Sequence, residues 1–155
     1  MTTREITMNE TLAHIELVGR LLGNAIRELS LRASQHDHSK LKDPEFEHFV
    51  RHADSLRVLT YGSKEYKACL KRLKPALNHH YGVNRHHPEH FRGGVNSMSL
   101  IDLLEMIVDW YAATKRHADG DIWRSIEVNS KRFNVGKQLQ MILANTVNDL
   151  KLDAK

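Results

Sequence analysis

Cysteine and long apolar runs are almost missing from this sequence. Cys69 is the single cysteine among 155 residues, so the chain cannot form an internal disulfide, and we expect a reducing, cytoplasmic compartment. No stretch approaches the roughly 18 consecutive apolar residues of a membrane span. The polar segment from Met1 to Ile6 lacks the apolar core of a signal peptide. A fold of this chain therefore depends on an ordinary hydrophobic core.

Aromatic residues are also scarce, at 6% of the chain, and no basic stripe is interleaved with them. The bases of a single-stranded nucleic acid therefore have no evident surface on which to stack. Neither Cys69 nor any serine lies in a glycine-framed turn, which argues against a nucleophilic serine or cysteine. The formal charge of +4 suits a phosphate-bearing ligand or nucleic acid but selects no function.

Apolar residues recur at three- and four-residue steps through most of the chain. This periodicity predicts an all-α fold, a compact bundle of about six helices in a single domain, residues 1–155. The predicted helices cover residues 8–33, 44–56, 64–81, 99–117, 122–133 and 137–150. We expect Thr7 to cap the first helix with Glu10 as its capping-box partner, and Pro75 to bend or interrupt the third. Residues 82–97 lack periodicity and are predicted to be a loop.

Two of these helices are expected to bury particular apolar side chains. In the second helix these are Phe46, Phe49 and Val50. Helix 99–117 has the strongest apolar stripe of the chain. Its predicted members are Leu100, Leu103, Leu104, Ile107, Val108 and Tyr111.

Histidine is the residue that the chain has in excess. There are eleven histidines, and five of them lie between His79 and His90. Neutral imidazole is a common ligand for zinc, iron and other transition metals. This stretch holds two pairs, His79-His80 at a predicted helix end and His86-His87 in the loop that follows. We interpret their density as a metal site, and the sequence leaves open which member of each pair binds.

Two other places in the first third of the chain offer metal ligands. Glu10 and His14 lie one turn apart on the first predicted helix, although a capping role for Glu10 and a hydrogen-bonded core role for His14 explain them as well. The adjacent His36 and Asp37 offer one nitrogen and one oxygen, and a carboxylate has two oxygens with which to bridge two metals. Lys40 follows one turn later and can pair with a phosphate oxygen.

The last place is the helix predicted over residues 99–117. Glu105 and Asp109 lie one turn apart beside its apolar stripe, and Arg116 lies two turns further on. We expect Asp109 at the edge of the core, where an unpaired carboxylate would be costly. Its partner is either a metal or a neighbouring cation, Lys115 or Arg116.

Taken in order, these residues resemble the ligand series of the HD-domain metal-dependent phosphohydrolases: Glu-x-x-x-His, His-Asp-x-x-Lys, the doubled histidines and a final Asp. The whole chain is also similar to an uncharacterised family of small bacterial and phage proteins. That family shares the His-Asp-x-Ser-Lys segment from His36, the histidine-rich loop and the Glu-Met-x-x-Asp-Trp helix from Glu105. The resemblance implies an HD-like helical fold and hydrolysis of a phosphate ester or anhydride, with a nucleotide as the expected substrate.

The same resemblance implies a site with two divalent metals, of which Fe, Mn, Co, Ni and Zn all suit mixed nitrogen and oxygen ligands. The first metal would be held by His14, His36, Asp37 and Asp109. The second would be held by Asp37, one of His79 or His80, and one of His86 or His87. Glu10 would serve a third metal or support a ligand. Lys40 and Arg116 would face the phosphoryl oxygens while a metal-activated hydroxide attacks phosphorus.

Two other functions fit the same residues. Some HD-type proteins with a similar ligand order use a mixed-valent di-iron centre for oxygenation, and iron analysis with oxygen consumption would distinguish them. The other is a non-enzymatic module that binds nucleic acid or protein around a structural metal. A homo-oligomer is compatible with each of these functions.

Overall fold

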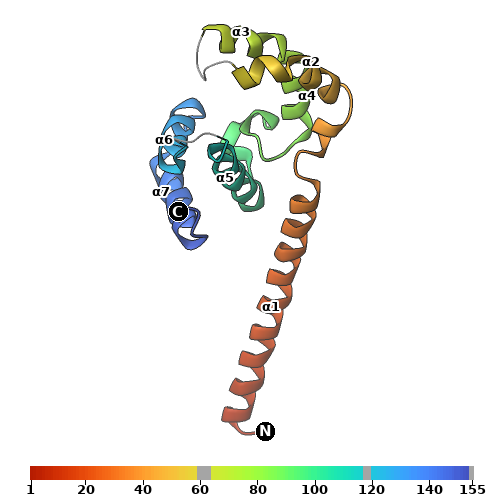
Figure 1. Cartoon of the computed structure of the whole chain (residues 1–155). Coiled ribbons are helices and arrows are strands. Elements are labelled where there is room, and N and C mark those ends of the chain that lie inside the picture. The colour runs from red at the N-terminus through yellow and green to blue at the C-terminus, as the bar shows by residue number, and fades with distance from the viewer. Residues whose placement is uncertain (59–63, 117–119, 154–155) are drawn as a thin grey trace. The chain divides into compact units, whose positions relative to one another are not determined.

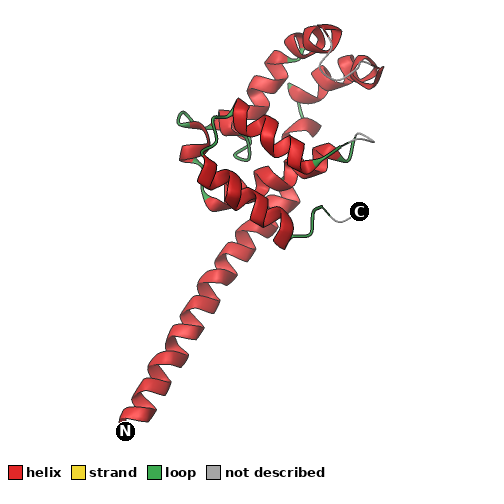
Figure 2. Ribbon diagram, turned by 90° about the vertical axis from the view of Figure 1, so that its left-hand side faces the viewer, coloured by secondary structure: helices red, strands yellow, loops and turns green. Residues whose placement is uncertain are grey.

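The computed structural model describes residues 1–58, 64–116 and 120–153. Over these residues the chain forms seven α-helices and three short 3₁₀ helices, and it has no strand (Figures 1 and 2). The all-α class that the periodicity predicted is confirmed. Among the described helices, none combines the length and the hydropathy that a membrane span requires.

The helices follow the predicted order, except that one predicted helix is divided into two. The α-helices are α1 (Thr3–Gln35), α2 (Glu45–Val58), α3 (Lys64–Arg72), α4 (Lys74–Val83), α5 (Leu100–Thr114), α6 (Ile122–Arg132) and α7 (Lys137–Asp149), and the 3₁₀ helices are η1 (His38–Leu41), η2 (Pro88–His90) and η3 (Gly94–Ser97). The third predicted helix is divided into α3 and α4 because Pro75 lies in the first turn of α4, where its missing N–H costs no hydrogen bond. The predicted loop 82–97 contains η2 and η3.

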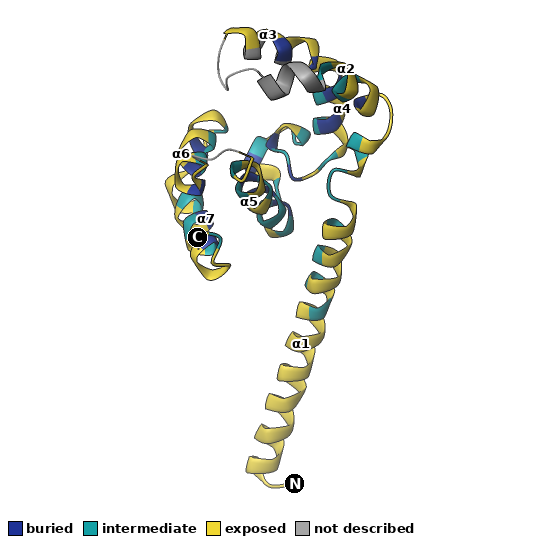
Figure 3. Cartoon of the chain, viewed as in Figure 1, coloured by how far each residue is buried: buried dark blue, intermediate teal, exposed yellow. Residues whose placement is uncertain are grey.

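The contacts divide the chain into two units, Met1–Gln35 and His36–Lys155. The first unit is α1, which begins earlier than predicted. Its capping pair is Thr2 and Glu5 instead of Thr7 and Glu10: the Glu5 N–H donates to Thr2 Oγ1 at 3.3 Å, and the Thr2 N–H donates to Glu5 Oε2 at 2.7 Å. No residue of α1 is buried (Figure 3). The single domain expected from the chain length stays a prediction.

The core of the second unit lies between α5, α6 and α7. Its buried members come from all three helices: Met106, Ile107, Trp110, Ile122, Ile126, Leu143 and Val147. The Trp110 ring stacks on Phe133 with ring centroids 6.2 Å apart. Leu100 and Val108, predicted in the apolar stripe, are 78% and 41% exposed. For these two residues the prediction was wrong, because α5 turns Met106 and Trp110 towards the core instead, whereas the other four predicted members are buried in the core or pack against it: Leu103, Leu104, Ile107 and Tyr111.

A second group of buried side chains lies where α2 contacts α4 and η1. Of the side chains predicted to be buried in α2, only Phe49 is half-buried, whereas Phe46 and Val50 are 45% and 55% exposed. The reason is the rotation of the helix. Glu45 is fully buried, and Phe49 follows it by four residues on the same side, which turns Phe46 and Val50 away.

Candidate metal centre

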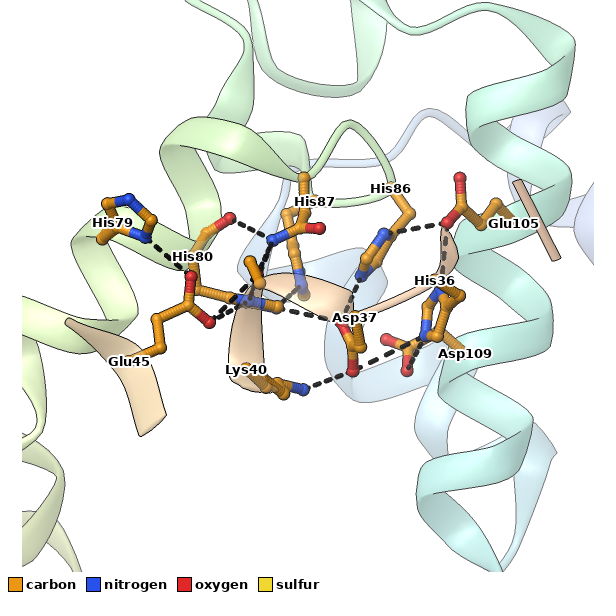
Figure 4. A network of polar contacts seen from close by, with 12 residues as sticks. His36, Asp37, Lys40, Glu45, His79, His80, His86, His87, Glu105 and Asp109 are labelled. Atoms are coloured by element: carbon orange, nitrogen blue, oxygen red, sulfur yellow. Dashed lines mark hydrogen bonds and ion pairs between the residues drawn. The ribbon is translucent and has the colours of Figure 1, made fainter. Parts of the chain in front are cut away.

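Three segments of the second unit bring polar side chains together: residues 36–45, residues 79–87 and the middle of α5 (Figure 4). In the first segment, Asp37 has an unusual backbone conformation, with φ 59° and ψ 11°. Aspartate adopts this left-handed region more readily than most residues, and such positions are enriched at functional sites. The Lys40 N–H donates to the Asp37 carbonyl at 2.9 Å, which closes the turn into η1.

The Asp37 carboxylate lies at the centre of the cluster, and its two oxygens face different groups. Oδ1 is 3.3 Å from His80 Nε2 and 3.5 Å from His86 Nε2. Oδ2 is 3.6 Å from His36 Nε2 and 2.5 Å from Lys40 Nζ. This carboxylate therefore has the position of a ligand shared between two cations.

Two groups of candidate ligand atoms surround Asp37. His80, His86 and His87 gather at one side, where His80 Nε2 and His87 Nε2 face each other at 2.8 Å. His36 and Asp109 gather at the other, where His36 Nε2 is 3.6 Å from Asp109 Oδ1. Six of the eight predicted metal ligands thus meet within one part of the second unit: His36, Asp37, His80, His86, His87 and Asp109.

A buried carboxylate that the sequence analysis did not identify holds the first histidine pair. Glu45 Oε2 is 2.9 Å from His80 Nδ1, and Oε1 is 2.7 Å from His79 Nδ1. An ionised carboxylate can only accept, so the proton of His80 lies on Nδ1 and the lone pair of its Nε2 faces the cluster. Asn84 Nδ2 also lies 2.9 Å from His80 Nδ1, but its two amide protons have closer acceptors in Ser39 Oγ and the His80 carbonyl, each at 2.8 Å.

Glu105 has the same role at the other end of the cluster. Its Oε1 is 2.9 Å from His36 Nδ1 and 3.1 Å from His86 Nδ1, so both rings turn Nε2 towards Asp37. His36, His86 and Glu105 also satisfy the spacing of a metal group. We interpret them as support for the ligands, because carboxylate–imidazole pairs of this kind fix the tautomer and orientation of metal-binding histidines.

The structure distinguishes the members of the first histidine pair. The His80 side chain is 2% exposed and enters the cluster, whereas His79 is 40% exposed and contacts the other oxygen of Glu45. Both members of the second pair, His86 and His87, contribute ring nitrogens.

An ion pair between the half-exposed Arg85 and the buried Asp102 holds the histidine loop against α5. Arg85 Nε and Nη2 donate to the two oxygens of Asp102 at 3.1 and 3.0 Å, the bidentate geometry that makes such pairs strong. Asp102 is fully buried and forms a capping box with Ser99 at the start of α5. Because Arg85 precedes His86 and Asp102 lies one turn before Glu105, the pair sets the position of two ligand-bearing segments.

Contacts with carboxylates favour the protonated form of two imidazoles of the cluster. Asp109 first, and then Glu105, raise the pKa of His36 to about 10. Burial opposes the protonation of His86, but its contacts with Asp37 and Glu105 are stronger and raise its pKa. Protons on these rings supply positive charge at the positions where a bound cation would otherwise supply it.

The remaining groups have the protonation states in which side chains bind metals. Burial lowers the pKa of His80, and burial together with the charge of His86 lowers the pKa of His87 to about 3. Burial pushes the pKa of Asp37 and of Asp109 upward. The contacts of Asp37 with His86 and Lys40, and those of Asp109 with His36 and His86, together outweigh burial and hold both pKa values below the ordinary range. Neutral imidazoles and ionised carboxylates bind metals without first losing a proton.

Two buried polar atoms of the cluster lack a hydrogen-bond partner among the described residues, Asp37 Oδ1 and His86 Nε2. Buried polar atoms are paired in the great majority of cases. These two face each other across 3.5 Å, and the Nε2 atom of His80 lies beside them. A cation held among these atoms would satisfy all of them at once, so the residues present fit a metal.

The exposure of the side chains indicates how a ligand would reach the cluster. His80 and His86 are 2% exposed and lie at its buried side. Asp37, Asp109 and Lys40 are 20%, 23% and 33% exposed. A small anion can therefore approach from the side of these three residues.

Like His79, three further predicted site residues are not among the ligand groups that the described residues form: Glu10, His14 and Arg116. Glu10 and His14 belong to α1 in the first unit, and their parts in a site stay predictions. Arg116 is exposed in the turn after α5. The carboxylate of Asp109 contacts His36, whereas Lys115 lies over the Tyr111 ring at 4.6 Å from its centroid.

Fold and site together describe an all-α protein with a candidate metal centre of histidine and aspartate side chains. A family model matches residues 3–150, almost the whole chain, and the chain belongs to that family, which is described as a family of unknown function (DUF5662). No curated protein and no solved structure matches the chain. A functional proposal therefore rests on the geometry of the site.

Proposed function

We propose that this chain is a metal-dependent hydrolase that cleaves a phosphate ester or anhydride, with a nucleotide as the expected substrate. One observation carries the proposal. The Nε2 atoms of four histidines and both oxygens of Asp37 converge, while two outer carboxylates hold the opposite ring nitrogens of three of these histidines. So many partly buried ionisable groups would be costly to gather without a cation among them.

The donor atoms support two neighbouring cations that share Asp37. One would be held by His80, His86 and His87 with Asp37 Oδ1, and the other by His36 and Asp109 with Asp37 Oδ2. Fe, Mn, Co, Ni and Zn all suit this mixture of nitrogen and oxygen. The HD-like fold, and the roles that the HD resemblance gives to His14, Glu10 and Arg116, are also part of this proposal.

Two such cations, when bound, would lower the pKa of a coordinated water towards neutrality and offset the charge of a phosphoryl group. The lowered pKa values of Asp37 and Asp109 keep both carboxylates ionised at neutral pH. The Lys40 ammonium, now on Asp37 Oδ2, lies on the accessible side of the cluster. It is positioned to exchange this partner for a phosphoryl oxygen, which would form a charge-assisted bond.

Elemental analysis of the purified full chain tests the proposal, followed by a metal-supplemented screen of nucleotides and a generic phosphodiester for phosphoester cleavage. We expect bound transition metal and cleavage of at least one phosphate compound. His36→Ala and Asp37→Ala should each lose both. His38→Ala changes an exposed histidine between these ligands and Lys40, so it should retain both and serves as the matched control.

The other outcomes each have a definite meaning. Metal retained in both alanine variants would refute the centre. Bound iron with oxygen uptake and no phosphoester cleavage would replace the hydrolase with the di-iron oxygenase. Bound metal with neither activity would favour a binding module with a structural metal.

A further inference from the structure

One face of α1 is an apolar seam, which we define as Met8, Leu12, Ile15, Leu22, Ile26 and Leu29. These residues follow one another at three-, four- and seven-residue steps, so they share one side of the helix. In the first unit, which is this helix, no residue is buried. The five members from Met8 to Ile26 are 54–63% exposed. A contiguous apolar surface of this kind marks an interaction site.

The length of the seam limits what can cover it. From residue 8 to residue 29 it runs about 33 Å at 1.5 Å per residue. The described helices of the second unit have between 9 and 15 residues, which is at most about 22 Å. Among the described helices, only another α1 is long enough to follow the whole seam. The seven-residue spacing of Met8, Ile15, Leu22 and Leu29 is also that of two long helices packed side by side.

Charges along one edge of the seam indicate the direction of the partner. Glu5, Glu16, Arg20 and Arg27 follow this edge at eleven-, four- and seven-residue steps, each close to a whole number of turns. The edge is acidic in the first half of α1 and basic in the second. In an antiparallel pair the same edges of the two helices meet, so each acidic half lies against a basic half. A parallel pair would instead bring this edge against the other, where Val18 lies.

We propose that α1 pairs with α1 of a second copy of this chain, antiparallel and through the seam, to form a symmetric dimer. The two-fold axis would pass near the middle of the seam, close to Gly19. An added Cβ at Gly19 would meet no atom within 4 Å in a single chain, so this position leaves room for a second backbone to approach. The proposal rests on α1 alone and does not depend on the proposed function.

Sedimentation equilibrium of the full chain at micromolar concentration measures the dimer directly. The wild type should be a dimer, and Leu22→Arg, in the middle of the seam, should be a monomer. Leu17→Arg is the matched control, because Leu17 is 43% exposed on the opposite side of α1, and it should stay a dimer. Circular dichroism checks that both variants keep their helix content. A monomeric wild type, or a dimer lost in Leu17→Arg and kept in Leu22→Arg, would overturn the proposal.

A charge exchange tests the antiparallel direction. Glu16→Arg places like charges against the basic half of the partner and should raise the dimer dissociation constant about tenfold. Adding Arg20→Glu in the same chain restores opposite charges and should return the constant close to the wild-type value. If the double variant is weaker than Glu16→Arg alone, the helices do not pair antiparallel through this edge.

Discussion

Glu45 and Glu105 have the same task at opposite ends of the cluster, yet the imidazoles they hold differ in charge. Glu45 is fully buried and holds one ring that enters the cluster, that of His80, whose pKa is lowered. Glu105 holds two such rings, those of His36 and His86, and both pKa values are raised. A carboxylate partner orients an imidazole in both cases, but burial and the other charges nearby determine whether the ring keeps a proton.

This comparison predicts two unlike ends of one metal centre. His80 and His87 can bind a cation without proton release, because their pKa values are lowered, whereas His36 and His86, whose pKa values are raised, must lose protons first. Asp37 belongs to both ends. The pair of Arg85 and Asp102 holds the histidine loop and α5 together. Substitutions can therefore remove both ends, weaken one of them, or change the connection between them.

Asp37→Asn should have the largest effect because Asp37 is the only ligand shared by both ends. We expect metal affinity to fall by more than the 10- to roughly 100-fold that loss of an outer carboxylate costs, and elemental analysis after dialysis should find no bound metal. Asp43→Asn alters an exposed aspartate of the same segment and should bind metal as the wild type does. An Asp37→Asn protein with full metal content would show that the cation binds elsewhere.

Glu105→Gln and Glu45→Gln test the two supporting carboxylates one at a time. An amide can donate towards Nδ1, which favours a tautomer whose Nε2 carries the proton and faces the metal. Each variant should therefore bind metal about 10–100-fold more weakly, and Glu105→Gln should lose more because it supports two ligands. Isothermal titration measures both affinities. Glu47→Gln, an exposed glutamate of α2, is the control, and equal affinities in all three variants would contradict these positioning roles.

The stability of the metal-free protein should decline on both sides of pH 6.5. The pKa of His36 in the folded protein is raised from 6.5 to about 10. Its protonation therefore contributes fully to the free energy of unfolding below pH 6.5, and this contribution is lost as the pH rises towards 10. The pKa of His87 in the folded protein is lowered to about 3. Its neutral form therefore contributes fully to the free energy of unfolding above pH 6.5, and this contribution is lost as the pH falls towards 3.

Thermal unfolding in a chelator, followed across this range, checks both directions. His36→Gln should flatten the alkaline side of the profile, and His87→Gln should reduce the loss on the acidic side. A His36→Gln profile that still falls as steeply between pH 6.5 and 10 as that of the wild type would contradict the assignment of His36.

Arg85→Ala should have the smallest effect on metal binding, because it removes no ligand and no partner of a ligand. It leaves the buried Asp102 without its bidentate partner, which should lower the free energy of unfolding by about 1–3 kcal/mol. Urea denaturation measures this change. Arg92→Ala, an exposed position in the same loop, should be close to neutral. Metal affinity lost as strongly as in Glu105→Gln would mean that Arg85 acts on the ligands directly.

The sequence was sufficient to predict the all-α class and most of the inner residues of the cluster. His36, Asp37 and Asp109 were candidates because a His-Asp doublet and a carboxylate beside an apolar stripe offer ligand atoms, and the resemblance to the HD ligand series assigned them to one site. The i,i+4 pair of Glu105 and Asp109 was visible too, but nothing in the spacing told which of the two faces the metal and which supports a histidine.

The remaining features depend on how helices rotate against one another. His79 and His80 are neighbours on α4, and the buried position of Glu45 decides which of them turns inward. Glu45 itself follows Pro44, so the sequence presents it as an ordinary acid in the first turn of a helix. Only one other feature of the sequence indicated its position. Phe49, four residues later, is apolar, which places Glu45 on the inner side of α2.

The most direct test is a crystal structure of the full chain with anomalous diffraction recorded at the absorption edge of the metal found by elemental analysis. We expect anomalous density beside Asp37, with ligand distances of about 2.0–2.3 Å to its carboxylate and to the Nε2 atoms of His80 and His86. Glu45 and Glu105 should remain on the Nδ1 side of their histidines. Density only at another place, or a metal bound through Nδ1 with these carboxylates displaced, would contradict the proposed metal centre.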